Sequence, residues 1–335
     1  MKILMENWLY YYQHLPGHIN PVAFKIGIFS INWYSIGYLV GFFVVYSLLK
    51  FRIKKGEFSA SKFSIFNFQF SNKFQIPNSK LSKKLVLDFM FYAILGVLVG
   101  GRLGYVLFYN LPYYLAHPLE IFLPIQAAGY LPTGQAGGLQ VTGIYGMSYH
   151  GGLLGVILAS YIFSKKRKFN FWKWADFVVP AIPAGYFFGR IGNFLNGELY
   201  GRATEKFWGM YFPVSAETQN FSSLQLRHPS QLYEAFFEGL VLFIILWALR
   251  NGIKYKNKLF HACLSGRQVP CFALYVMGYG IFRLAIEFFR EPDPQIGLIF
   301  NFLTLGQLLS LAMVVFGVII CFARAPKNRY NEANG

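Results

Sequence analysis

The segment Gly189–Gly201, GRIGNFLNGELYG, places several polar side chains among apolar ones. Arg190 carries a planar fork of N–H donors that suits a phosphate group. Asn193 can donate and accept hydrogen bonds, and Glu198 can orient the arginine or bind a hydroxyl group. Gly201 and the other glycines permit turns and close backbone approach. A self-satisfied polar helix end is the competing interpretation, but so many polar groups together favour anion binding.

Two further segments carry ionisable groups at helical spacing. In RHPSQLYEAFFEG, Ser230 is a possible N-cap, and Glu234 and Glu238 are four residues apart, so they share a helix face. These carboxylates could instead complement the helix dipole. In YGIFRLAIEFFREPD, the set Tyr279, Arg283 and Glu287 also recurs every four residues. A structural ion pair and a second phosphate-binding guanidinium both remain open for that set.

Three other side chains are weaker candidates. His150, in YHGGLLG, could act as a base or bind a polar substrate, and an interfacial histidine is an equal alternative. Tyr34, in NWYSIGY, could belong to an aromatic belt at the membrane surface. Arg102, in LGGRLGYVLFYN, could extend to the outer interface.

The elements that must position these residues are predicted to cross a membrane. Of 335 residues, 55% are hydrophobic and 13% are charged, whereas soluble domains carry about a quarter of charged residues. We expect an all-α integral membrane protein of about seven transmembrane helices. The apolar segments that predict them are 31–49, 88–109, 148–164, 175–192, 231–249, 270–289 and 302–323.

Lysine and arginine predict the orientation of these helices. One set of alternate connections holds 22 lysines and arginines. The other set, the outer loops in which Arg290 is counted, holds 6, and three more lie inside helices. Since cytoplasmic loops are the basic ones, the N-terminus is expected outside and the C-terminus inside. The net charge of +17 is then mainly a membrane-facing collar, so a nucleic-acid partner is not expected.

The chain is interpreted as one membrane domain, 1–335, with insertions at about 51–85 and 110–147 and a loop region on the periplasmic side. We expect the first insertion to be cytoplasmic and poorly ordered and the second to be periplasmic and flexible. No cleavable signal peptide is expected at the N-terminus. The three cysteines lack metal-site spacing, so neither a zinc site nor a disulfide framework is predicted.

With this topology, the ionisable groups could converge on one outward-opening cavity. The predicted set is Arg190, His150, Glu234, Arg283 and Glu287. Two arginines with few competing acids would attract an anion, and phospholipid head groups are the abundant anions of a bilayer. A lipid transporter could use the same arginines, but it would need charges along a path to the cytoplasm. A structural scaffold would not need such a cluster.

The quoted segments resemble those of the bacterial prolipoprotein diacylglyceryl transferases, in the same order. The resemblance covers about 31–50, 88–115 and 145–323. It implies a multi-pass inner-membrane enzyme that moves the diacylglyceryl group of phosphatidylglycerol onto the lipobox cysteine thiol of prolipoproteins. That reaction is the first step of lipoprotein maturation, and it leaves a thioether and releases glycerol phosphate.

The resemblance also implies roles for individual residues. Catalytic roles would fall to His150, Arg190, Arg283 and Tyr279. Substrate-binding roles would fall to Arg190, Asn193, Glu198, Gly201, Tyr34, Glu234 and Glu287. The reaction needs a thiolate and a stabilised phosphate leaving group; His150 is one candidate base and Tyr279 a weaker one. No metal or cofactor is expected.

Overall fold

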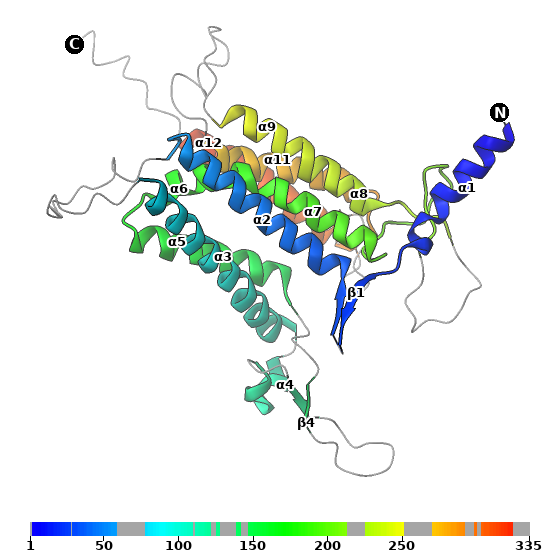
Figure 1. Ribbon diagram of the computed structural model, residues 1–335, viewed down its shortest axis with the longest axis horizontal. Coiled ribbons are helices and arrows are strands. Elements are labelled where there is room, and N and C mark those ends of the chain that lie inside the picture. The colour runs from blue at the N-terminus through cyan, green and yellow to red at the C-terminus, as the bar shows by residue number, and fades with distance from the viewer. Residues whose placement is uncertain are drawn as a thin grey trace, which may run out of the picture. The chain divides into compact units, whose positions relative to one another are not determined.

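Helices dominate the computed structural model shown in Figure 1. It describes residues 2–27, 29–58, 78–109, 111–121, 125–127, 139–141, 147–212, 225–250, 270–291, 298–299 and 303–323. The chain forms two compact units, one of residues 1–57 and 175–335 and one of 58–174. The organisation as one membrane domain stays a prediction. The two insertions, predicted to be poorly ordered and flexible, lie largely outside the described residues.

The first unit holds the helices that carry most of the candidate site residues. They are α1 (Lys2–His18), α2 (Trp33–Lys54), η3 (Val179–Ala181), α7 (Ile182–Leu195), α8 (Ser230–Glu234), the π-helical segment η5 (Ala235–Val241), α9 (Leu242–Leu249), α11 (Cys271–Ile286) and α12 (Leu305–Ala323). Two small antiparallel pairs complete it: β1 (Val22–Ile26) with β2 (Phe29–Asn32), and β5 (Leu298–Ile299) with β6 (Leu303–Thr304).

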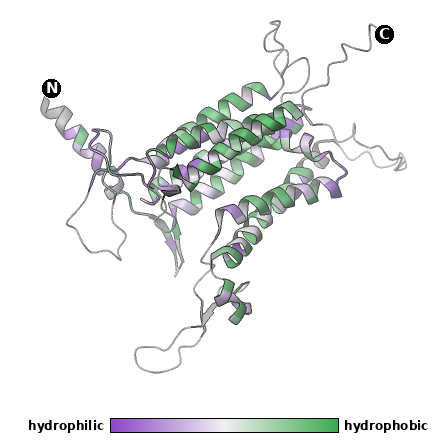
Figure 2. Cartoon of the chain, turned by 180° about the vertical axis from the view of Figure 1, so that it is seen from behind, coloured by the Kyte–Doolittle hydropathy of each residue, from purple (hydrophilic) through white to green (hydrophobic). Residues whose placement is uncertain are grey.

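Hydrophobic residues, coloured green in Figure 2, make up much of the long helices. Each of the seven apolar segments predicted from the sequence contains a helix. Within the described ranges, four helices are long and apolar enough to cross a membrane: Trp33–Lys54, Lys84–Phe108, Ser230–Leu249 and Leu305–Ala323. Exposed residues such as Leu39 and Phe43 suit contact with lipid, because hydrocarbon does not penalise apolar surface. The protein is therefore a multi-pass membrane protein.

The predicted helix over 175–192 is not one regular helix. Helix α6 (Phe171–Val178) ends before the short 3-10 helix η3, and α7 begins at Ile182. Pro180 and Pro183 lie at the starts of η3 and α7 and have no backbone N–H to continue a hydrogen-bond ladder. The break makes α7 a separate short helix that presents Arg190.

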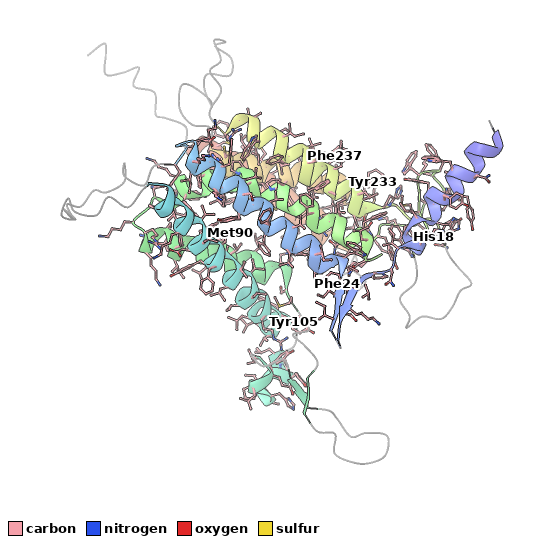
Figure 3. All side chains as sticks on the ribbon, in the orientation of Figure 1. His18, Phe24, Met90, Tyr105, Tyr233 and Phe237 are labelled. Carbon is pink, nitrogen blue, oxygen red and sulfur yellow. The ribbon has the colours of Figure 1, made fainter. Side chains whose placement is uncertain are left out.

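The fifth apolar segment is one continuous helix with an unusual middle. Helix α8 passes into the π-helical segment η5 directly after Glu234 and returns to α-helix in α9. Figure 3 labels Tyr233 and Phe237, which follow one another along this helix. A buried cluster of Val179, Leu242, Leu246 and Tyr279 joins it to η3 and α11. The site residues of α8 and α11 are therefore anchored by a shared apolar core.

The second unit consists mainly of two packed helices, α3 (Asn78–Tyr109) and α5 (Tyr149–Lys166). It also holds α4 (Leu111–Ala116), η2 (Pro118–Ile121) and the pair β3 (Ile125–Ala127) and β4 (Leu139–Val141). Arg102 donates from Nε to the Ile121 carbonyl at 3.0 Å, and its guanidinium covers the Tyr114 ring. Arg102 therefore has a structural role within this unit.

Gly155→Val is expected to lower the free energy of unfolding. A Cβ at Gly155 would lie 2.0 Å from the Gly96 carbonyl oxygen and 2.8 Å from the Gly100 Cα. Both contacts are with backbone, so α3 and α5 must separate, at a cost of about 1–3 kcal/mol or more. Thermal unfolding of the purified protein in detergent measures the change. Gly152→Ala is the matched control, because its nearest contact is an ordinary 3.5 Å; equal melting temperatures for both variants would contradict the argument.

Candidate active site

Arg190 lies on α7 and makes polar contacts in three directions. Its Nε donates to the Tyr186 hydroxyl oxygen at 2.7 Å and lies 2.7 Å from Glu234 Oε2. Its Nη1 donates to Asn193 Oδ1 at 3.3 Å. The Tyr186 ring also packs beneath the guanidinium, 4.8 Å from it. These contacts hold the planar fork in one orientation.

Other residues of the segment Gly189–Gly201 hold Arg190 in its orientation. Asn193 is buried and donates from Nδ2 to Glu198 Oε1 at 2.9 Å, so Glu198 orients Arg190 through Asn193. Helix α7 ends at Leu195, and Gly197 turns the chain with a φ of 68°. The segment is thus a helix end followed by a tight turn, a shape that the sequence alone left undecided.

Tyr34, predicted to bind substrate, lies at the start of α2 and is tied to the same turn. Its backbone N–H donates to Asn196 Oδ1 at 3.1 Å. Its ring contacts the Tyr38 ring, with centroids 4.6 Å apart. The bond to Asn196 fixes the start of α2 against the end of α7.

Glu234 is the centre of the site, because its fully buried carboxylate meets three arginines. Besides Arg190, its Oε1 lies 3.4 Å from Arg283 Nη1 and 3.1 Å from Arg290 Nη1. Glu238 adds a second buried carboxylate, which accepts from the Tyr186 hydroxyl. The expectation of few competing acids is therefore wrong, and Glu238 does more than complement a helix dipole. The carboxylates offset the cost of burying arginine in an apolar bundle.

Helix α11 contributes the third predicted group. Arg283 Nε lies 3.2 Å from Glu287 Oε2, as the four-residue spacing predicted. Glu287 Oε1 in turn accepts from Thr304 Oγ1 at 3.2 Å, which ties α11 to the start of α12. Tyr279 is buried and meets the Tyr186 ring edge-on, with centroids 6.0 Å apart. Arg283 thus lies within ion-pair distance of three carboxylates, those of Glu234, Glu238 and Glu287.

The start of α8 is fixed by bonds to the turn after α7. Ser230 is not the N-cap that the sequence suggested, because its Oγ donates to the Leu199 carbonyl at 3.0 Å and Pro229 occupies the cap position. Gln231 donates from Nε2 to the Glu198 carbonyl at 2.6 Å. These bonds fix the position of α8 and therefore of Glu234. The π-helical segment η5 begins directly after Glu234, and π-helical turns are frequent at functional sites.

Two isolated β-bridges, which we call the platform, position Arg290 near Glu234. The sequence had placed Arg290 in an outer loop. Residue Gly201 forms a β-bridge with Arg290, and Ala203 forms another with Arg227. His228 lies inside the platform, where burial lowers its pKa and Lys206 lowers it further. Because the platform holds the Arg290 backbone, the guanidinium can bond Glu234.

Sequence reasoning assigned no role to four side chains of this network: Tyr186, Gln231, Arg290 and Thr304. Tyr186 precedes Arg190 by four residues and so shares its helix face, a signal that was available. Arg290 had no such signal, since only the bridge to Gly201 brings it back to the helices. His150 belongs to the other compact unit, where it is exposed near the start of α5. Its predicted part in the site stays a prediction.

Four buried polar atoms of the network have no hydrogen-bond partner among the described residues: Gln231 Oε1, Glu238 Oε1, Arg283 Nη1 and Glu287 Oε2. Buried polar atoms are nearly always satisfied, so such atoms call for an explanation. Donor and acceptor atoms in one apolar bundle are the contacts that a polar lipid head group needs. The arrangement can bind an anion through arginine while the neighbouring carboxylates hold those arginines in place.

Tyr186→Phe is expected to lower catalytic efficiency by about ten- to a hundredfold. The change removes the hydroxyl that accepts from Arg190 and donates to Glu238, while the ring remains. Leaving buried partners unpaired costs about 1–3 kcal/mol. Steady-state kinetics of the reaction proposed below measure the effect. Tyr46→Phe in α2 is the matched control, and an equal loss in both variants would contradict a specific role for Tyr186.

Apolar helices long enough to span a membrane, packed around buried and paired arginines and glutamates, define a multi-pass membrane protein with a buried polar site. The chain belongs to the prolipoprotein diacylglyceryl transferase family, whose model matches residues 21–323. The resemblance predicted from the sequence is confirmed, and the chain is a membrane transferase of lipoprotein biosynthesis.

Relatives of this family match nearly the whole chain. A phosphatidylglycerol–prolipoprotein diacylglyceryl transferase of Chlorobaculum tepidum is 42% identical over 314 residues, 94% of this chain and 93% of the relative. One of Rickettsia bellii is 43% identical over 306 residues, 90% of this chain and 94% of its own. A third relative, from Desulfotalea psychrophila, is 42% identical over 314 residues, which are 93% of this chain and 96% of the relative.

Proposed function

We propose that this chain transfers the diacylglyceryl group of phosphatidylglycerol to the lipobox cysteine thiol of prolipoproteins. The names of its relatives support the two substrates. The observation that carries the proposal is that Arg190 and Arg283, from different helices, meet at one buried carboxylate, Glu234. Two guanidiniums held this way suit a single lipid phosphate.

In the proposed complex, the phosphate binds between Arg190 and Arg283. Asn193 and Glu198 keep Arg190 oriented, and Glu287 does the same for Arg283. Arg283 Nη1 lies within ion-pair distance of Glu234 and Glu238 but makes no hydrogen bond to a described residue, so it has an N–H donor to offer the phosphate. Gly201, Tyr34 and Glu234 contribute by shaping the walls of the site. Binding therefore uses donors that are already oriented before the lipid arrives.

The proposed reaction is a displacement at the glyceryl carbon that carries the phosphate. The thiolate sulfur forms the new C–S bond as the C–O bond breaks, and the electron pair leaves on the phosphate oxygen of glycerol phosphate. Arg190 and Arg283 stabilise that oxygen, an effect that low dielectric strengthens. A free cysteine has a pKa of about 8.5, so a base that takes the thiol proton raises the rate. His150 and Tyr279 remain the candidates for that base.

We further propose seven spans in the bacterial inner membrane, with the N-terminus in the periplasm. Support comes from the connections between the apolar segments, which alternate along the sequence between many and few lysines and arginines. Each of the seven apolar segments contains at least one helix. This orientation places the end of α7 and the start of α8 on the periplasmic side, where a prolipoprotein presents its lipobox after export.

The proposal is tested with purified protein, phosphatidylglycerol and a synthetic lipobox peptide. Mass spectrometry is expected to find the peptide with a diacylglyceryl thioether and an equal amount of glycerol phosphate. A peptide with serine in place of cysteine is the matched control. A product without glycerol phosphate, or acyl transfer in place of diacylglyceryl transfer, would refute the displacement.

A further inference from the structure

A second cluster of charges lies at the far end of α2 from Tyr34. There an open surface cavity of about 580 Å³ is lined by Phe51, Lys55, Gly56, Glu57 and Arg250. It brings together the last turn of α2 and the residue that follows α9. None of these residues takes part in the network around Glu234, so the cavity is a separate place in the fold.

The carboxylate in this cavity is already neutralised. Gly56 adopts a φ of 73° after α2, and the turn brings the Glu57 backbone N–H to the Arg52 carbonyl at 3.1 Å. Glu57 Oε2 then accepts from Arg52 Nε at 2.6 Å, and Oε1 accepts from Arg250 Nε at 3.2 Å. Lys55 also lines the cavity, so Arg52, Arg250, Lys55 and Glu57 together carry a formal charge of +2.

Two of these cations keep donors available. Arg250 bonds Glu57 and the Trp247 carbonyl, which occupies two of its five N–H groups within the described residues. Its guanidinium carbon lies over the Trp247 ring, 4.1 Å from the centroid. Lys55 is exposed, and its ammonium lies 5.8 Å from the Phe51 ring. Arg52 is buried and already donates to Glu57 and to the Phe177 carbonyl. Lys55 and Arg250 are therefore the groups that can bind a ligand.

We propose that this cavity binds the phosphate of an anionic lipid head group, outside the catalytic site. The excess positive charge favours an anion, and the Arg250 fork suits a phosphate. A lipid is favoured over a soluble phosphate because Phe51 is 43% exposed and pairs with Trp247, with centroids 6.2 Å apart. Aromatic rings beside basic side chains at the end of a spanning helix are typical of the membrane interface.

The test uses a photoactivatable phosphatidic acid, which is not the proposed substrate, with the full chain in phosphatidylcholine nanodiscs. After illumination, mass spectrometry is expected to find crosslinks in the peptides around Phe51 and Arg250. Unlabelled phosphatidylserine is expected to reduce them several-fold, and soluble inorganic phosphate is expected to leave them unchanged. Reduction by inorganic phosphate alone would overturn the assignment to lipid.

Two variants separate this site from general surface charge. Lys55→Gln is expected to reduce the crosslink several-fold, and Arg250→Lys, which keeps the charge, is expected to reduce it because the fork is lost. Lys165→Gln, an exposed lysine of α5, removes the same charge elsewhere and is expected to leave the crosslink intact. Equal crosslinking in all three variants would overturn the proposal. The readout involves no diacylglyceryl transfer, so it stands apart from the test of the proposed function.

Discussion

Arg190→Lys is expected to lower the rate of diacylglyceryl transfer by about a hundredfold or more. Lysine keeps the charge, but one nitrogen cannot replace the Nε that bonds Tyr186 and Glu234 together with the Nη1 that bonds Asn193. The variant also loses the planar fork for the phosphate. Removing one oriented donor from such a site typically costs a hundred- to a thousandfold in rate. Mass spectrometry of the lipobox peptide measures the product over time.

The matched control for Arg190→Lys is Arg167→Lys. Arg167 forms a partly exposed ion pair with Asp88, where exposed pairs contribute about 1 kcal/mol or less. We expect normal transfer and a normal melting temperature for this control. If Arg190→Lys transferred lipid at the same rate as Arg167→Lys, charge alone would suffice, and a bidentate phosphate clamp at Arg190 would be excluded.

Gly201→Ala is expected to lower transfer at least tenfold and also to destabilise the protein. A Cβ at Gly201 would lie 2.2 Å from the Phe289 carbonyl oxygen and 3.0 Å from the His228 carbonyl oxygen. Both are backbone atoms, so the bridge between Gly201 and Arg290 must open. The Arg290 guanidinium then moves away from Glu234, which changes the charge balance that orients Arg190. Overpacking of this kind costs about 1–3 kcal/mol.

A glycine of the same segment gives the matched control for Gly201→Ala. The nearest atom to a Cβ at Gly189 is 3.9 Å away, in the Tyr38 ring, so alanine fits. Because alanine favours helix over glycine by up to about 1 kcal/mol, Gly189→Ala is expected to be as stable as the parent protein or slightly more so. The measurements are the transfer rates and melting temperatures of Gly201→Ala and Gly189→Ala, each compared with the parent protein. A fully active Gly201→Ala would show that the platform does not position Arg290.

The sequence predicted the positions of the helices better than their internal structure. Hydropathy marks where apolar helices occur, because lipid-facing side chains must be apolar. It does not register the η3 break between α6 and α7 or the π-helical turn of η5, which depend on backbone hydrogen bonds. The N-terminal helix α1 was also missed, because its mixed composition gives no long apolar run. Seven spans and their orientation stay predictions.

The site could be predicted where helical spacing carries the information. Arg283 and Glu287 are four residues apart on one helix, and their ion pair follows from that spacing. The contact between Glu234 and three arginines depends on how α7, α8 and α11 pack, which no local pattern encodes. Counting charges by loop also hid Arg290, since a loop residue can fold back onto a helix. The roles of the site residues in catalysis remain proposals.

The pairing of arginines with glutamates has a consequence for the response to membrane voltage. Formal charges cancel across the network of Arg190, Arg283, Arg290, Glu234, Glu238 and Glu287. An uncompensated charge crossing a membrane gains or loses about 2.3 kcal/mol per 100 mV. An electroneutral cluster experiences no net force from the same field. In the proposed topology, depolarisation of the cell therefore exerts no net force on this cluster.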